Sequence, residues 1–165
     1  MAKVIDFHGE GFQNEGEKLA FNQLNAQLPE TFTIIPNLSI TIQGTPMEID
    51  LLVIGPECVW VIETKSNYPP VKITQHEYLV GEAPRDTHPV KKSRKNAQKL
   101  ASKLRTLTSD GVPFFQHLVV FAPNPLSLEV SDESKPFVRL ISETVETLLN
   151  PKHVVPEDFY FLLIQ

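Results

Sequence analysis

The sequence MEIDLLVIGPECVWVIETK, from Met47 to Lys65, places an Asp, a Glu and a Lys inside two runs that otherwise have the composition of buried strands. A Gly-Pro-Glu turn separates the runs, so the stretch predicts a β-hairpin. Because side chains alternate along a strand, Asp50 is predicted to share a face with Leu52, and Glu63 to share one with Lys65. Ionised groups on an apolar face are unfavourable unless they are paired, hydrogen-bonded or bound to a metal. The three charged residues of this hairpin therefore require partners.

Length and cysteine content set the class of protein. The chain has 165 residues, which is enough to bury a core within a single domain. Its one cysteine, Cys58, excludes an intramolecular disulfide and argues against a cysteine-rich zinc site. Because Cys58 lies in a predicted strand, we expect its thiol to be buried and inert. A single cysteine also favours a reducing compartment.

Hydropathy and net charge bear on whether the protein contacts a membrane or a nucleic acid. No apolar run approaches the roughly 20 residues of a membrane span, and the N-terminus lacks a secretory signal. We therefore expect a cytoplasmic protein that does not contact a membrane. The net charge of -5 argues against an indiscriminate nucleic-acid binder, although a local basic face can coexist with an acidic total. The final run, FYFLLIQ, has no polar tail, which favours fused or associated domains beyond Gln165.

A first helix is predicted from Gly11 to Leu28, with Phe21 and Leu24 on its inward stripe. At about 100° per residue, Glu17 falls within this stripe, whereas Glu15 points well away from it. Glu17 is thus a second carboxylate that is predicted to face the interior. The alternative is an acid in the first turn that favours the helix dipole and still reaches solvent.

A second helix is predicted from Val90 to Thr108, with an apolar stripe that includes Ala97 and Leu100. Its other faces are basic and carry no acidic residue. One side of the helix presents a row of lysines, namely Lys92, Lys95, Lys99 and Lys103. Lysines spaced in this way can neutralise successive phosphates of a nucleic acid, and the alternative is a simple solvated face.

The remaining segments predict an α/β class. A strand region from Phe32 to Ile42 is interrupted by Pro36, which favours an edge or bulged strand. Further strands are predicted around residues 71–73 and 78–80, and a buried one from Phe115 to Phe121. A short helix is predicted from Ser142 to Leu149. This order of elements predicts an α/β domain with a mixed central sheet flanked by helices.

The charged residues of the hairpin can form one site. Neighbouring strands lie about 4.8 Å apart, so Asp50 and Glu63 can converge at one end of the sheet. Two carboxylates with waters and phosphate oxygens make a ligand set for Mg²⁺, and Lys65 could polarise a water or stabilise charge on a phosphate. A buried ion pair between an acid and Lys65 would explain the same residues.

These residues carry a family resemblance. Gly16-Glu17 on the first helix, Glu48-Ile49-Asp50 on a strand, and Ile62-Glu63-Thr64-Lys65 on the next resemble the nuclease-related domain family, NERD, of the PD-(D/E)XK nuclease superfamily. The resemblance covers about residues 9–125, which we expect to form the core of a single domain spanning 1–165, with 126–165 as a C-terminal extension.

The resemblance implies a restriction-endonuclease-like core and a site that cleaves phosphodiester bonds with Mg²⁺, for which Mn²⁺ could substitute. By this correspondence Asp50, Glu63 and the main-chain carbonyl of Thr64 would be metal ligands. Lys65 would position or activate the attacking water, and Glu17 would complete the acidic site. DNA is the expected substrate in preference to RNA.

The second helix departs from the family pattern at its start. Many members have a Gln shortly after an Asn-Pro, whereas here His88-Pro89 opens the helix and Lys92 stands near the Gln position. Substrate contacts at this point are therefore expected to differ. Two other functions fit the sequence: a nucleic-acid-binding module without turnover, and a structural or partner-binding domain.

Overall fold

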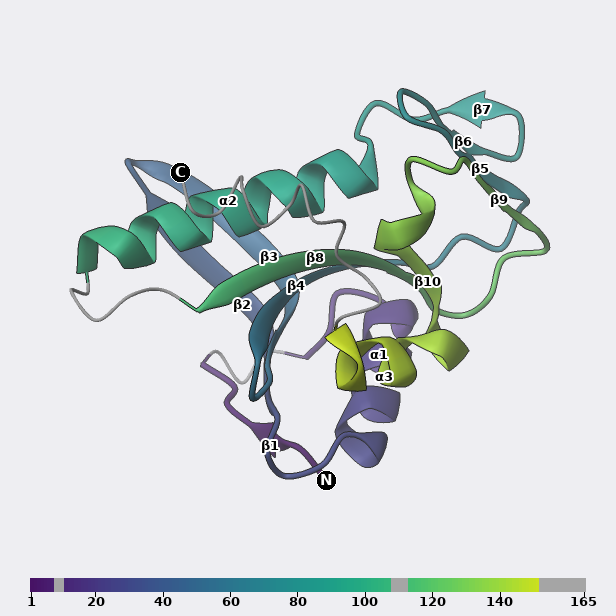
Figure 1. Ribbon diagram of the computed structural model, residues 1–165. Coiled ribbons are helices and arrows are strands. Elements are labelled where there is room, and N and C mark those ends of the chain that lie inside the picture. Colours follow the sequence, from purple (N-terminus) through teal and green to yellow (C-terminus); the bar gives the residue numbers. More distant parts are fainter. Residues whose placement is uncertain (8–10, 108–112, 152–165) are drawn as a thin grey trace.

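The computed structural model describes residues 1–7, 11–107 and 113–151. They form two sheets and three α-helices (Figure 1). The six-stranded central sheet has the order β1 (Lys3–Val4), β2 (Thr33–Ile42), β3 (Thr45–Ile54), β4 (Cys58–Lys65), β8 (Phe114–Phe121) and β10 (Val138–Leu140). The four-stranded sheet has the order β7 (Ala83–Pro84), β6 (Tyr78–Val80), β5 (Val71–Ile73) and β9 (Leu128–Val130).

The central sheet is mixed. Strands β2, β3 and β4 are antiparallel neighbours, whereas β4, β8 and β10 run parallel, as do β1 and β2. Long crossover connections join the parallel strands. The one between β4 and β8 contains β5, β6, β7 and α2, whereas β9 of the small sheet lies between β8 and β10. The prediction of a mixed sheet flanked by helices is confirmed.

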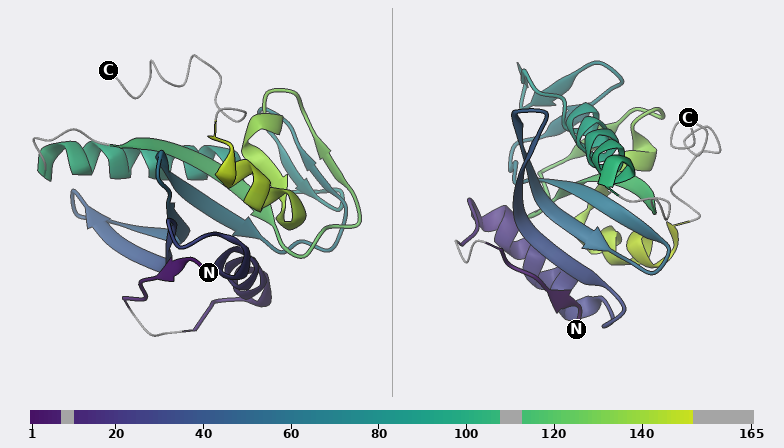
Figure 2. Two further views of the ribbon diagram at one scale, coloured as in Figure 1. Left: turned by 60° about the horizontal axis from the view of Figure 1, so that its bottom comes forward. Right: turned by 90° about the vertical axis from the view of Figure 1, so that its left-hand side faces the viewer.

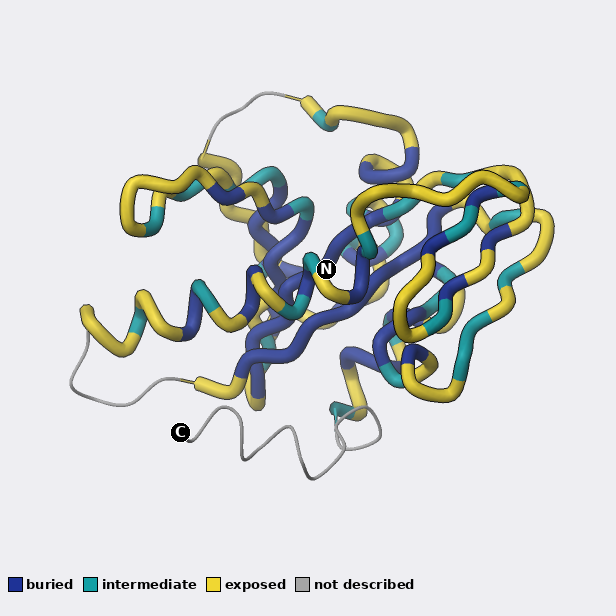
Figure 3. The backbone as a smooth tube through the Cα atoms, turned by 90° about the horizontal axis from the view of Figure 1, so that it is seen from above, coloured by how far each residue is buried: buried dark blue, intermediate teal, exposed yellow. Residues whose placement is uncertain are grey.

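Helices cover both faces of the central sheet (Figures 1 and 2). The helices are α1 (Glu15–Gln27), α2 (Pro89–Leu107) and α3 (Ile141–Leu149), and a short 3-10 helix spans Lys135–Phe137. Helices α1 and α3 pack on one face, where Leu24 and Leu148 join Trp60 in an apolar cluster. Helix α2 covers the other face, where Leu100 packs with Val59 and other strand residues. The tube in Figure 3 shows the buried strands at the centre of these layers.

The predicted hairpin is β3 and β4, paired from Ile54–Val59 to Leu51–Ile62. The prediction that side chains alternate strictly through Asp50 is wrong. Ile49 and Leu52 both pack into the cluster under α2, whereas strict alternation would place residues three apart on opposite faces. On the N-terminal side of Leu51, β3 is no longer paired with β4, but it stays paired with β2 as far as Thr45. The polar residues therefore lie where the two strands of the hairpin separate.

Strand β2 passes through Pro36 without a break. The carbonyl of Ile34 accepts a hydrogen bond from Ile5, so alternate residues of β2 direct their main-chain groups toward the side of β1. Pro36 is next in this series and lies past the end of β1 (Lys3–Val4), where its missing N–H loses no strand partner. The predicted interruption is wrong, and the predicted edge holds only for the part of β2 past the end of β1, because β2 lies between β1 and β3 in the sheet.

The helix boundaries differ from the predictions at their starts. Helix α1 begins at Glu15 and not at Gly11, because the side chain of Asn14 caps it by accepting from the main-chain N–H of Glu17 at 2.9 Å. Helix α2 begins at Pro89, whose fixed φ suits the first turn. The predicted end of this helix at Thr108, and the FYFLLIQ run, lie outside the described residues. Across the described parts of the chain, no helix combines the length and apolar content needed to cross a bilayer.

Candidate active site

Asp50 lies on β3 at the fork where β3 and β4 separate, and its side chain is hydrogen-bonded to β4. Its Oδ2 accepts from the main-chain N–H of Thr64 at 2.8 Å and from the Thr64 hydroxyl at 3.1 Å. The carboxylate thus replaces the main-chain partner that β3 no longer supplies to β4. Because the N–H and C=O of a strand residue point to the same side, the Thr64 carbonyl also faces Asp50.

Glu63 is the most enclosed of the charged hairpin residues, with its side chain 5% exposed. One of its oxygens, Oε1, receives two ammonium groups. Lys92 Nζ of α2 donates to it at 2.9 Å, and Lys65 Nζ lies 3.5 Å away. The lysine side chains are 40% and 26% exposed, so this side of the site is open to solvent.

Glu17 reaches the site from α1 and is buried, as the helical wheel predicts. Its carboxylate accepts from the N–H of Gln13 at 3.2 Å and from the Asn14 amide at 3.3 Å. Gly16, which precedes Glu17, lets α1 approach the end of β8 closely. A Cβ on Gly16 would lie 2.3 Å from the carbonyl oxygen of Ala122, which follows β8.

The carboxylates act on one another electrostatically. Burial raises the pKa of Glu17, and the charges of Asp50, Glu63 and Glu48 raise it further, against the lowering effect of the Gln13 N–H. Burial also raises the pKa of Glu63, followed by the charge of Asp50, and the two lysine ammonium groups oppose this. Such mutual repulsion among buried acids is relieved by a bound cation.

The opposite effect acts on the lysine from α2. Burial alone would lower the pKa of Lys92, but its hydrogen bond to Glu63 and the charges of Glu63, Asp50 and Glu48 outweigh burial and raise it. Lys92 is therefore held in its charged form inside the site. Ion pairs with a buried acid were the structural alternative to a metal site. They are present, because both Lys92 and Lys65 contact Glu63.

The donor set fits a metal that needs only two carboxylates. Within residues 1–7, 11–107 and 113–151, no group of three or more His, Cys, Asp or Glu is arranged to hold an ion. The hydrogen bonds to Asp50 end on Oδ2, and the lysines contact Oε1 of Glu63. Oδ1 of Asp50 and Oε2 of Glu63 thus receive no hydrogen bond from the described residues. Together with the Thr64 carbonyl, these two oxygens are the groups that could bind Mg²⁺, an ion that usually keeps several of its waters.

The lysine row of α2 divides into two parts. Lys92 lies in the site, whereas Lys95 and Lys103 are exposed and Lys99 is half-buried. The row therefore starts at Glu63 and runs along α2 for about 16 Å, at a rise of about 1.5 Å per residue. Nothing in the hairpin sequence indicated the Lys92–Glu63 contact, although its place near the family Gln was a usable signal.

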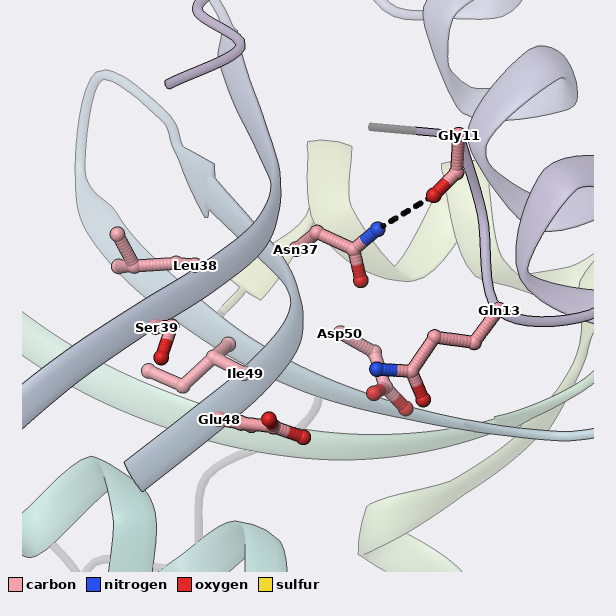
Figure 4. A pocket seen from close by; sticks show the side chains of 8 residues that line it. All are labelled: Gly11, Gln13, Asn37, Leu38, Ser39, Glu48, Ile49 and Asp50. Carbon is pink, nitrogen blue, oxygen red and sulfur yellow. Dashed lines mark hydrogen bonds between the residues drawn. The ribbon is translucent and has the colours of Figure 1, made fainter. Parts of the chain in front are cut away.

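A cavity of about 290 Å³ opens beside Asp50, between the segment that precedes α1 and strands β2 and β3 (Figure 4). Apart from Asp50 and Glu48 of the family motif, its polar lining residues belong to no pattern in the sequence. These additional residues are Gln13, Asn37 and Ser39. They come from two parts of the chain, and no local pattern brings them together.

Comparison with family models identifies the family of this chain. The sequence model of NERD, described as a nuclease-related domain, matches residues 13–122. No curated protein sequence matches significantly. Among solved structures, one titled "Crystal Structure of Protein of Unknown Function AF1548" is similar at 14% identity and a TM-score of 0.46. The similarity covers 76% of this chain but only 55% of that one. Because the family model matches residues 13–122, which is more than half of the chain, the chain belongs to the NERD family of nuclease-related domains.

Proposed function

We propose that this domain is a metal-dependent nuclease that hydrolyses phosphodiester bonds of DNA. The observation that carries the proposal is the fork between β3 and β4. There Asp50 and Glu63 each keep an oxygen that receives no hydrogen bond from the described residues, and Lys65 lies beside Glu63. A structural ion pair explains the lysine contact, but it does not explain a second carboxylate held next to the first.

Each side chain has a role that follows from its position. Asp50, Glu63 and the Thr64 carbonyl would hold Mg²⁺, which when bound supplies Lewis acidity at a phosphate oxygen. Lys65 is partly exposed and contacts Glu63, so its ammonium group can orient the attacking water and stabilise charge that develops on the phosphoryl group. Hydrolysis adds this water to phosphorus, and the P–O bond to the leaving sugar oxygen breaks.

The basic row of α2 supports a polymeric substrate. Lys92 is anchored at Glu63, and the exposed Lys95 and Lys103 continue along the same helix. A phosphate backbone that follows this row would enter the site at Lys92. Contacts of this kind fix the position of a nucleic acid without reading its sequence.

The direct test is cleavage of supercoiled plasmid, single-stranded DNA and RNA in Mg²⁺ or Mn²⁺. Wild-type protein is compared with Asp50→Asn and Lys65→Met. Asp50→Asn keeps an oxygen for the Thr64 hydrogen bonds but removes the charge. Each variant is expected to lose cleavage by about 100-fold or more, as when one group that stabilises a transition state is removed.

Matched controls separate chemistry from folding. Glu57→Gln changes an exposed carboxylate in the turn at the far end of β4, and Lys3→Met changes an exposed lysine on β1. Both should cleave like wild type. Cleavage that persists unchanged in Asp50→Asn and Lys65→Met would refute the nuclease assignment, and faster cleavage of RNA than of DNA would correct the substrate.

Binding without turnover is the second candidate, and the lysine row of α2 favours it. It predicts metal-independent, salt-sensitive binding of DNA that weakens when Lys95 and Lys103 are neutralised. Calorimetric titration with Mn²⁺ discriminates the two. Binding of Mn²⁺ that is lost in Asp50→Asn supports the nuclease, and its absence in wild type supports the binding module or a structural ion pair.

A further inference from the structure

The cavity beside Asp50 has a lining unlike that of a phosphate site. Its polar residues are two carboxylates, two amides and a hydroxyl, from Asp50, Glu48, Gln13, Asn37 and Ser39. Among the lining residues that the structure describes there is no lysine, arginine or histidine. A phosphate would be repelled by the two acids, and no cationic side chain among the described lining residues offsets that repulsion. The lining instead fits an uncharged group that donates hydrogen bonds.

The cavity also offers apolar contact and a fixed frame. Leu38 and Ile49 contribute apolar surface to its wall. The Asn37 amide donates to the carbonyl of Gly11 at 3.2 Å, which leaves its own oxygen as an acceptor (Figure 4). On the other side, the carbonyl of Glu48 accepts from Asn96 of α2 at 3.3 Å. The lining segments are thus tied together before any ligand arrives.

We propose that this cavity is a subsite for a nucleobase of the substrate, and that it favours bases with an exocyclic amino group. The inference rests on the proposed nuclease function, because Asp50 belongs both to the cavity and to the candidate metal site. A base is flat, with apolar faces that can contact Leu38 and Ile49 and a polar edge that can reach Glu48. Carboxylates accept hydrogen bonds from the amino group of cytosine, and adenine and guanine also carry one, whereas thymine does not.

The preference follows from the chemistry of the lining. Where cytosine presents its amino group, thymine presents the carbonyl oxygen O4, and its one ring donor, N3–H, is flanked by two carbonyl oxygens that the carboxylates of Glu48 and Asp50 repel. One such contact discriminates between bases by about tenfold or more. Cleavage should therefore favour phosphates that adjoin cytosine, adenine or guanine over those that adjoin thymine only.

The first experiment measures binding without cleavage. Deoxycytidine and thymidine are titrated separately into ¹⁵N-labelled wild-type protein, and amide chemical shifts are followed by NMR. We expect deoxycytidine to shift the amides of Asn37, Ser39 and Glu48 and thymidine to leave them nearly unchanged. Equal shifts with both nucleosides, or none with either, overturn the subsite whether or not the protein cleaves DNA.

The second experiment measures base preference in cleavage. Oligothymidine strands that contain one cytosine are compared with strands of thymine alone, using wild type, Glu48→Ala and the exposed control Glu57→Ala. Wild type and Glu57→Ala are expected to cut about tenfold faster beside the cytosine, and Glu48→Ala is expected to cut both strands at the slower rate. Even cutting by wild type, or a preference that survives Glu48→Ala, refutes the subsite but leaves the nuclease standing. No cutting of any strand by wild type, with Mg²⁺ or Mn²⁺, counts instead against the proposed function.

Discussion

Gly16→Ala tests how closely α1 must approach the sheet to deliver Glu17. The added Cβ would lie 2.3 Å from the Ala122 carbonyl oxygen and 2.4 Å from Cβ of Ser66. Ordinary van der Waals contact begins at 3.4 Å, so the methyl group falls short by about 1.1 Å. One of the atoms it meets is main chain, which cannot rotate away as a flexible side chain would.

Two effects of the substitution have opposite signs. Alanine favours a helix over glycine by about 1 kcal/mol. Overpacking in a core costs about 1–3 kcal/mol. We expect the clash to dominate, and the free energy of unfolding to fall by up to about 2 kcal/mol. A helix displaced by about 1 Å carries Glu17 with it, and misplacement on this scale lowers a rate by about 100-fold.

Urea denaturation and plasmid cleavage measure the two consequences of Gly16→Ala. Asn22→Ala is the matched control, because it improves helix propensity at an exposed position of the same helix and adds no clash. The control should be as stable as wild type, or slightly more so, with unchanged cleavage. If Gly16→Ala has the midpoint and the cleavage rate of Asn22→Ala, the close approach has no importance for the site.

Three further predictions follow from the electrostatics. Glu17→Gln should raise the melting temperature of the metal-free protein at neutral pH, because the raised pKa of Glu17 means that its ionised form destabilises the fold. This gain should vanish below about pH 4, where the unfolded carboxyl is also protonated, and a gain that persists there refutes the charge explanation. Lys92→Met should lower cleavage by about 100-fold, because Lys92 contacts Glu63 in the site. Lys95→Met should only weaken DNA binding and reduce the number of ions released on binding by about one. Equal effects of the two substitutions would mean that Lys92 contributes only to DNA binding. Burial, followed by the charge of Glu57, raises the pKa of the Cys58 thiol to about 12, so a thiol reagent in mildly alkaline buffer should react with it only after unfolding, and fast reaction of the native protein contradicts this.

The sequence by itself determined the hairpin, its charged residues and the inward face of Glu17. These features depend on local periods: side chains alternate along a strand, and they recur at about 100° on a helix. The same kind of local pattern placed the basic row on α2. Such patterns act over neighbouring residues, so they survive without knowledge of the fold.

Only the tertiary structure decided how these parts meet. Lys92 and Glu63 are 29 residues apart, and their contact depends on where the crossover places the start of α2. Asp50 turns to Thr64 because β3 leaves β4 while it stays paired with β2, which alternation within one strand does not predict. The Gly16 approach and the cavity beside Asp50 likewise join segments distant in the chain. Packing between layers is non-local, and it turns the charged hairpin found in the sequence into a site with an entrance, a second lysine and a neighbouring pocket.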